Sequence, residues 1–259
     1  MKAADMFSLK GRAALVTGAS SGLGAQFARA LADNGASVAL VARRADRLKA
    51  LKDVIEDKGG KAATIEADVT DRAAMLRAFD EAERAFGTVT ILVNNAGVAQ
   101  QPVRVTDVTY EEWRRVLSTD LDAVFCWAQE GARRMLAARK QGSIVNVASV
   151  LGFNVSKGVA AYATAKAGVV QITKALALEL AFKGVRVNAI APGWFVTEIN
   201  DTYLNSEAGA ALKRDIPMGR FGEAGDLDGV LLLLVSDAGR YITGASIVVD
   251  GGQVVALKG

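Results

Sequence analysis

Tyr162 and Lys166 are two residues whose types and spacing could support proton transfer, in a stretch that contains no glycine or proline. A separation of four residues places both side chains on one face of a helix, one above the other. The positive charge of an ammonium favours the phenolate of a neighbouring tyrosine, so such a phenol exchanges protons closer to neutral pH. Ser149 ends an apolar run typical of a buried strand, and its hydroxyl could hold a carbonyl oxygen for the phenol to protonate. Taken alone, the pattern also fits a core aromatic beside a solvated lysine.

Composition narrows the chemistry. The chain of 259 residues contains no histidine and one cysteine, Cys126. This excludes Ser-His-Asp and Cys-His nucleophiles, histidine-ligated zinc, cysteine-rich metal sites and an intrachain disulfide, so we expect no metal. Proton transfer must then use tyrosine, lysine or carboxylates.

The charge balance and hydropathy limit the partners. The formal net charge is +3, and the arginine pairs are dispersed among acids, so we expect no nucleic-acid partner. No apolar segment is long enough for a signal peptide or a membrane span, which predicts a cytoplasmic protein with no membrane partner.

Short apolar runs alternate with longer segments that have the apolar spacing of helices. The expected strands are Ala13–Thr17, Ser37–Ala42, Ala62–Glu66, Ile91–Val93, Ser143–Ala148, Val185–Ile190 and Ser246–Val249. The expected helices are Gly22–Asn34, Ala45–Lys58, Asp71–Phe86, Tyr110–Ala138, Val159–Lys183 and Gly225–Ser236. This alternation predicts an α/β fold, a seven-stranded parallel sheet with helices on both faces, in a single domain over residues 1–259. Residues 197–222 are rich in small and polar side chains and are predicted to form a substrate lid loop.

A glycine-rich turn follows the first expected strand and precedes a helix, in the sequence Thr17-Gly-Ala-Ser-Ser-Gly-Leu-Gly24. Glycines permit a tight turn and let backbone amides approach a pyrophosphate, while the helix N-terminus favours an anion. The turn therefore predicts a dinucleotide site.

The order of several motifs resembles the short-chain dehydrogenase/reductase family. These are the Gly-x-x-x-Gly-x-Gly turn, Asn94-Asn-Ala-Gly97, Ser149, Tyr162-x-x-x-Lys166 and Pro192-Gly193, and the resemblance extends from Leu9 to Gly252. The tail Ile216-Pro-Met-Gly-Arg-Phe-Gly222 is most similar to 3-oxoacyl-carrier-protein reductases and gluconate or polyol dehydrogenases. The resemblance implies a Rossmann-type doubly wound domain that assembles as a homotetramer, with a dimer as the alternative.

The resemblance also implies the roles of individual residues. It assigns catalysis to Ser149, Tyr162 and Lys166. It assigns cofactor binding to Thr17, Gly18, Ser20, Ser21, Gly22, Leu23, Gly24, Asp68, Val69, Asn95, Ala96, Gly97, Pro192, Gly193, Phe195, Val196 and Thr197, together with Tyr162 and Lys166.

The end of the second expected strand bears on the choice of cofactor. An NAD enzyme would place an acid there for the ribose 2′-hydroxyl, whereas this chain has Ala42 followed by Arg43 and Arg44. A guanidinium can bind a 2′-phosphate through paired, charge-assisted hydrogen bonds. We therefore favour NADP(H), with NAD(H) as the alternative. Two solvated arginines beside Asp46 would also fit the pattern.

The function expected from these features is hydride transfer between a nicotinamide cofactor and a ketone or secondary alcohol. The residues expected to face the substrate are mostly apolar with a few amides: Gln100, Gln101, Val150, Leu151, Phe153, Asn154, Val155, Val159, Trp194 and Phe195. This set favours a hydrophobic ketone or a 3-oxoacyl thioester. The alternatives are an NAD-dependent sugar-acid or polyol dehydrogenase and a catalytically inactive nucleotide-binding regulator.

Asp120 departs from the family's pattern. The family often has an asparagine at this position, which supports a water that relays protons to the lysine. An aspartate can accept the same hydrogen bonds but adds a negative charge. Asp120 is therefore either part of the proton relay or an acid on the helix surface.

Overall fold

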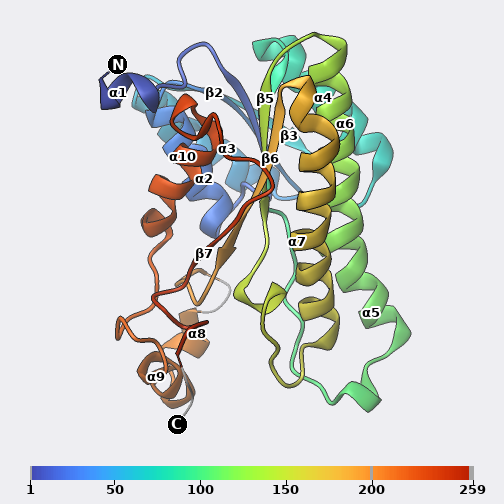
Figure 1. The fold of residues 1–259 in the computed structure, drawn as a ribbon, viewed down its shortest axis with the longest axis vertical. Coiled ribbons are helices and arrows are strands. Elements are labelled where there is room, and N and C mark those ends of the chain that lie inside the picture. The colour runs from blue at the N-terminus through green and yellow to red at the C-terminus, as the bar shows by residue number, and fades with distance from the viewer. Residues whose placement is uncertain (1, 199–200, 257–259) are drawn as a thin grey trace.

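The computed structural model describes residues 2–198 and 201–256. Seven strands form one sheet in the order β3-β2-β1-β4-β5-β6-β7, and every neighbouring pair is parallel (Figure 1). The strands are β1 (Ala13–Thr17), β2 (Ser37–Ala42), β3 (Lys61–Glu66), β4 (Val89–Asn94), β5 (Gly142–Val147), β6 (Val185–Pro192) and β7 (Ser246–Val249). The predicted doubly wound α/β fold is confirmed.

Both faces of the sheet are covered by helices, because its strands are apolar on both sides. In β1, Ala14 and Val16 belong to one core cluster and Leu15 belongs to the other. Helices α2 (Gly22–Asp33), α3 (Ala45–Asp57) and α10 (Asp228–Val235) cover the first face. Helices α4 (Arg72–Phe86), α6 (Ala123–Ala137) and α7 (Ala160–Leu180) cover the second (Figure 1).

The long helix predicted over Tyr110–Ala138 is interrupted. It consists of α5 (Tyr110–Leu117), a π-helical turn over Ser118–Asp122 and then α6. The hydroxyls of Ser118 and Thr119 each donate to the carbonyl of Arg115 at 3.1 Å. Such back-bonding competes with the regular helical ladder, and single π-helical turns inside helices are frequent at functional sites.

The segment predicted as a lid loop contains two short helices, α8 (Asp201–Leu204) and α9 (Glu207–Arg214). Residues 199–200 of the predicted lid lie outside the described residues. Leu204 and Ile216 are buried. Figure 1 shows α8 and α9 at the end of the molecule toward which β7 runs, which is the edge where the carboxyl ends of the parallel strands meet.

The remaining elements are short. They are α1 (Ala3–Met6) and the 3-10 turns Val105–Asp107, Val150–Gly152, Ala181–Lys183, Ala224–Leu227 and Asp237–Gly239. Within the described ranges, no helix combines the length and apolar character needed to cross a membrane.

Candidate active site

The order in which the chain adds strands to the sheet reverses between β1 and β4. The chain continues from β1 to β2 on one side and from β4 to β5 on the other, so a ligand-binding crevice is expected at the carboxyl ends of these strands. Thr17 lies at the end of β1 and links it to the residues after β4. Its hydroxyl accepts from the amides of Asn95 at 3.0 Å and Ala96 at 3.1 Å. The side-chain amide of Asn95 donates back to the Thr17 carbonyl at 3.0 Å. These three predicted site residues therefore join the two halves of the sheet.

The glycine-rich turn lies directly above this junction. Gly18 has φ +68°, and a Cβ placed on it would lie 2.8 Å from the Cα of Ala96. A Cβ on Gly24 would collide with the Gly18 carbonyl and the Asn95 amide. Helix α2 begins at Gly22, and Leu23 packs against the core. A turn with glycines at the closest backbone approaches, in front of a helix N-terminus, suits a pyrophosphate, so these residues fit a dinucleotide.

Two arginines lie beside the turn. Arg44 donates to the hydroxyl of Ser20 from Nη2 at 3.0 Å and from Nε at 3.2 Å, and to the hydroxyl of Ser21 at 2.6 Å. The side chain of Arg43 is 72% exposed and forms an ion pair with Asp68 at 3.8 Å. Both guanidiniums are thus held near the turn while remaining accessible to an anion.

Asp68 and Val69 follow β3. The amide of Thr70 lowers the pKa of Asp68, and the Thr70 hydroxyl and Arg43 lower it further. The Thr70 amide and hydroxyl donate to Asp68 Oδ1 at 2.9 and 2.7 Å. The carbonyl of Val69 accepts from the indole of Trp127 at 3.0 Å. Asp68 is therefore an ionised carboxylate in a locally ordered turn.

Tyr162 and Lys166 lie together on α7, as their spacing predicts. The Lys166 Nζ is 5.5 Å from the centre of the Tyr162 ring and donates to the Val147 carbonyl at 3.0 Å. Ser149 follows β5, and its hydroxyl oxygen accepts from the Leu151 amide at 3.1 Å. Because this bond uses an acceptor position, the hydroxyl proton of Ser149 can still be donated.

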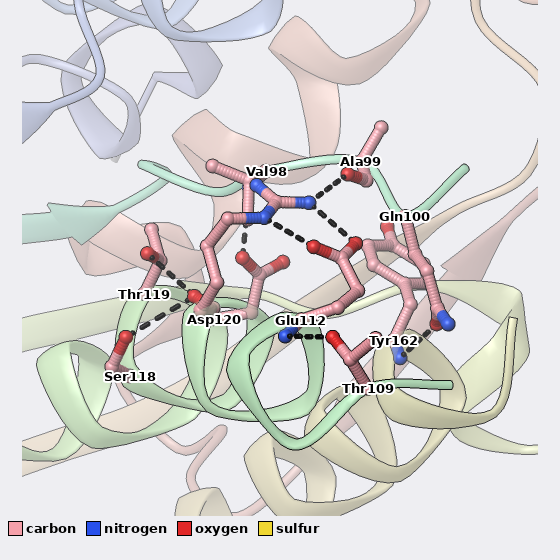
Figure 2. Close-up of polar contacts among 10 residues, drawn as sticks. Val98, Ala99, Gln100, Thr109, Glu112, Ser118, Thr119, Asp120 and Tyr162 are labelled. Carbon is pink, nitrogen blue, oxygen red and sulfur yellow. Dashed lines mark hydrogen bonds and ion pairs between the residues drawn. The ribbon is translucent and has the colours of Figure 1, made fainter. Parts of the chain in front are cut away.

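Asp120 is buried beside Lys166. The carboxylate is fully inaccessible to solvent, its Oδ2 is 3.2 Å from the Lys166 Nζ, and its Oδ1 accepts from the Val98 amide at 2.8 Å. Figure 2 shows Asp120 directed toward Val98. Burial alone lowers the pKa of Lys166, but the charges of Asp120 and Tyr162 outweigh burial and raise it. The interpretation of Asp120 as an acid on the helix surface is wrong.

The chain after β6 returns to the glycine-rich turn. Pro192 ends β6, and a Cβ on Gly193 would lie 2.7 Å from the Cβ of Asp250. Phe195 is 4% exposed and pairs with Gly222, so it packs inward, while Val196 is 40% exposed. Thr197 Cβ would be 3.5 Å from a Cβ placed on Gly22.

Several contacts in the site escape reasoning from sequence. Asp120 and Lys166 are held by backbone groups of Val98 and Val147, and the identity of these two side chains does not indicate such contacts. The π-helical turn that presents Asp120 has one available signal, the adjacent hydroxyls of Ser118 and Thr119 in the middle of a helical pattern. The side chain of Gln100 accepts from the Tyr162 amide at 3.0 Å (Figure 2).

Comparisons with known proteins agree with this geometry. A family model described as enoyl-(acyl carrier protein) reductase matches residues 18–253. 3beta-Hydroxysteroid dehydrogenase 1 from Eggerthella lenta is 41% identical over 251 residues, which cover 95% of each chain. A 3-oxoacyl-(acyl-carrier-protein) reductase from Staphylococcus aureus is 38% identical over 243 residues, covering 93% of this chain and 98% of that one.

A solved structure is similar over nearly its full length. The crystal structure of a gluconate 5-dehydrogenase from Burkholderia cenocepacia J2315, in complex with NADP and tartrate, has a TM-score of 0.93 at 35% identity. The match covers 99% of this chain and 100% of that one. The predicted similarity to 3-oxoacyl reductases and gluconate dehydrogenases is confirmed. The chain is therefore a member of the short-chain dehydrogenase/reductase family of oxidoreductases.

Proposed function

We propose that this protein is an NADP(H)-dependent oxidoreductase that interconverts a ketone and a secondary alcohol, with Ser149, Tyr162 and Lys166 as its catalytic residues. The observation that carries this proposal is the Lys166 ammonium 5.5 Å from the Tyr162 ring, at the carboxyl edge of the sheet. The nicotinamide, when bound, supplies hydride to the carbonyl carbon or accepts it from the alcohol. The neighbouring side chains hold the oxygen and move its proton.

Each side chain has a separate task. Ser149 donates its hydroxyl proton to the carbonyl oxygen and holds it in place. Tyr162 gives its phenolic proton to the developing alkoxide in reduction and takes it back in oxidation. The Lys166 ammonium, held by the Val147 carbonyl, favours the phenolate of Tyr162. Because the lysine is only 4% exposed, solvent screens its charge weakly.

The cofactor would lie along the crevice. We assign it to the turn and strand-end residues of the sequence analysis: Thr17, Gly18, Ser20, Ser21, Gly22, Leu23, Gly24, Arg43, Arg44, Asp68, Val69, Asn95, Ala96, Gly97, Pro192, Gly193, Phe195, Val196 and Thr197. The exposed guanidiniums of Arg43 and Arg44 support NADP(H) over NAD(H), because each can turn toward a 2′-phosphate. The NADP held by the Burkholderia relative agrees with this choice.

The surroundings of Ser149 support an apolar substrate. Phe153 and Val155, on the loop after β5, are 45% and 88% exposed. Exposed apolar side chains beside a catalytic crevice suit a hydrophobic ketone or a 3-oxoacyl thioester. The names of the steroid dehydrogenase and 3-oxoacyl reductase relatives agree with this class.

A second candidate substrate is a sugar acid or polyol. The side chain of Gln100 is 6% exposed, and its Nε2 has no hydrogen-bond partner among the described residues. Its Oε1 is occupied by the Tyr162 amide, which leaves the buried Nε2 as an unused donor close to Tyr162. The gluconate dehydrogenase relative is compatible with this alternative.

We further propose that residues 197–222 close over the cofactor within a single domain spanning residues 1–259. Arg47 on α3 forms an ion pair at 3.3 Å with Glu198, which would tie the start of this segment to the adenosine end. Homotetramer assembly, with a dimer as the alternative, would use the apolar groove of α6 and α7 lined by Leu121, Phe125 and Ile172. The cytoplasm is the expected location, where Cys126 would remain a free thiol.

Cofactor titrations, a substrate panel and a substitution of Tyr162 test this function. Fluorescence titrations with NADPH and NADH should show tighter binding of NADPH, and a panel of steroid, 3-oxoacyl and sugar-acid substrates should identify the class. Tyr162→Phe should lower turnover about 10²–10⁴-fold and leave NADPH affinity unchanged. Tyr110→Phe makes the same chemical change at an exposed position at the start of α5 and should leave turnover unchanged. Turnover by Tyr162→Phe near the wild-type rate would contradict the proposal.

A further inference from the structure

Asp120 and Lys166 form a buried pair whose charges cancel. Their side chains are 0% and 5% exposed, and the contact between Oδ2 and Nζ is 3.2 Å. An isolated buried ammonium would carry a full positive charge next to Tyr162, whereas a paired ammonium presents a much weaker field. The environment of the catalytic phenol therefore depends on Asp120 as well as on Lys166.

Local structure holds the carboxylate in this position. The π-helical turn places Asp120 against α7, and the Val98 amide fixes its second oxygen at 2.8 Å. Gly97 leaves room for the carboxylate, because a Cβ at this position would lie 3.0 Å from Asp120 Oδ2. The backbone therefore presents Asp120 to Lys166 in one geometry.

We propose that Asp120 is a positioning residue: its charged carboxylate holds the Lys166 ammonium, offsets its field at Tyr162 and so sets the pH at which the phenol releases its proton. This inference rests on the proposed function, in which Tyr162 exchanges the reacting proton. It assigns a direct ionic role to the carboxylate rather than a hydrogen-bonding role that a neutral amide could share.

The other polar groups that face the pair are either uncharged or already form an ion pair with another residue. From α5, Arg115 is bound by Glu112 at 2.6 and 2.7 Å. Glu112 is the main cause of the raised pKa of Arg115, and Asp120 contributes less. From the strand side, Val147 offers a carbonyl, and Ser149 offers a neutral hydroxyl. Lys166 is thus the cation that Asp120 chiefly compensates.

The sign of the effect follows from this arrangement. Removing the negative charge while keeping the shape leaves the Lys166 ammonium uncompensated, and at each pH where Lys166 stays protonated this ammonium favours the Tyr162 phenolate. Alcohol oxidation requires the phenolate, so its rate should reach half-maximum at lower pH. Ketone reduction requires the protonated phenol, so the rate of reduction should also begin to fall at lower pH.

The test compares Asp120→Asn with Asp122→Asn. Both substitutions remove one negative charge from the same turn, but Asp122 is 51% exposed and pairs with Arg114 at the surface. Asp120→Asn should lower the half-maximal pH of kcat/KM for oxidation by about one unit. Asp122→Asn should leave the half-maximal pH unchanged.

A second readout needs no cofactor. Ultraviolet titration of the tyrosinates in the cofactor-free protein, with Tyr162→Phe as the reference, isolates the step due to Tyr162. That step should also move to lower pH in Asp120→Asn and stay in place in Asp122→Asn. An unchanged or higher midpoint in Asp120→Asn overturns the inference, even where wild-type turnover depends on Tyr162.

The outcomes separate the two proposals. If wild-type protein has no nicotinamide-dependent turnover, the proposed function fails, and the ultraviolet titration alone then decides the role of Asp120. If Asp120→Asn does not fold, carbon NMR of lysine-labelled wild-type protein replaces it. Lys166 should then titrate above the exposed lysines. Titration below them would overturn the inference.

Discussion

Two of the acid–base pairs at the carboxyl edge of the sheet, one formed by Arg43 and the other by Lys166, differ in almost every physical respect. At the adenosine end, Arg43 and Asp68 are 3.8 Å apart with side chains 72% and 44% exposed. At the proposed catalytic end, Lys166 and Asp120 are 3.2 Å apart with side chains 5% and 0% exposed. The first pair lies in solvent and can rearrange, whereas the second is held by backbone groups on both sides.

The difference shows that an exposed ion pair and a buried ion pair suit different roles in the proposed site. An exposed pair gains little from its own contact, so Arg43 can exchange Asp68 for a phosphate at small cost. A buried pair has already given up its hydration, and each partner depends on the other. Recognition of a variable ligand suits the first arrangement, and a constant field at a reacting group suits the second.

The largest effect is expected when the buried pair is broken. Lys166→Met leaves the carboxylate of Asp120 buried without its cation, so we expect a loss of about 3–5 kcal/mol in the free energy of unfolding. Urea denaturation of the cofactor-free protein measures this loss. Turnover should also fall with the loss of the ammonium.

The control removes both charges. The double variant Asp120→Asn/Lys166→Met should recover much of the lost stability while remaining inactive. The raised pKa of Lys166 also determines how the stability of the folded protein depends on pH. Its stabilisation is fully present below the ordinary lysine value of about 10 and is lost as the pH rises through the higher folded value. A double variant no more stable than Lys166→Met would show that the two charges are not coupled.

An intermediate effect is expected at the adenosine end. Arg44→Ala removes the charge-assisted contact that we propose to the 2′-phosphate, so the Kd for NADPH should rise about 10–100-fold while that for NADH changes little. Fluorescence titration with both cofactors measures this difference. Lys49→Ala removes an equal charge from an exposed position on α3 and serves as the control. Equal losses for both cofactors would remove the assignment of Arg44 to the phosphate.

Reasoning from sequence predicted the fold and the proximity of Tyr162 and Lys166, because both rest on local signals. Alternating apolar runs predicted β1, β2 and β7 with the observed bounds, and a four-residue spacing brought Tyr162 and Lys166 together. The state of Asp120 depends instead on the π-helical turn and on the Val98 amide. Neither follows from periodicity, so the buried ion pair required the three-dimensional structure.

The smallest effect on the free energy of unfolding is expected when the exposed pair of Arg43 and Asp68 is broken. Asp68→Asn removes the charge of the exposed pair, but the substituted side chain can still accept from Thr70, so we expect a loss below about 1 kcal/mol. The lowered pKa of Asp68 means that its contribution is present above its ordinary value of about 4 and is lost as the pH falls through the lower folded value. Urea denaturation at neutral and acidic pH, at low and high salt, measures the difference, which added salt should reduce. A loss as large as that of Lys166→Met, insensitive to salt, would mean that exposure does not distinguish the two pairs.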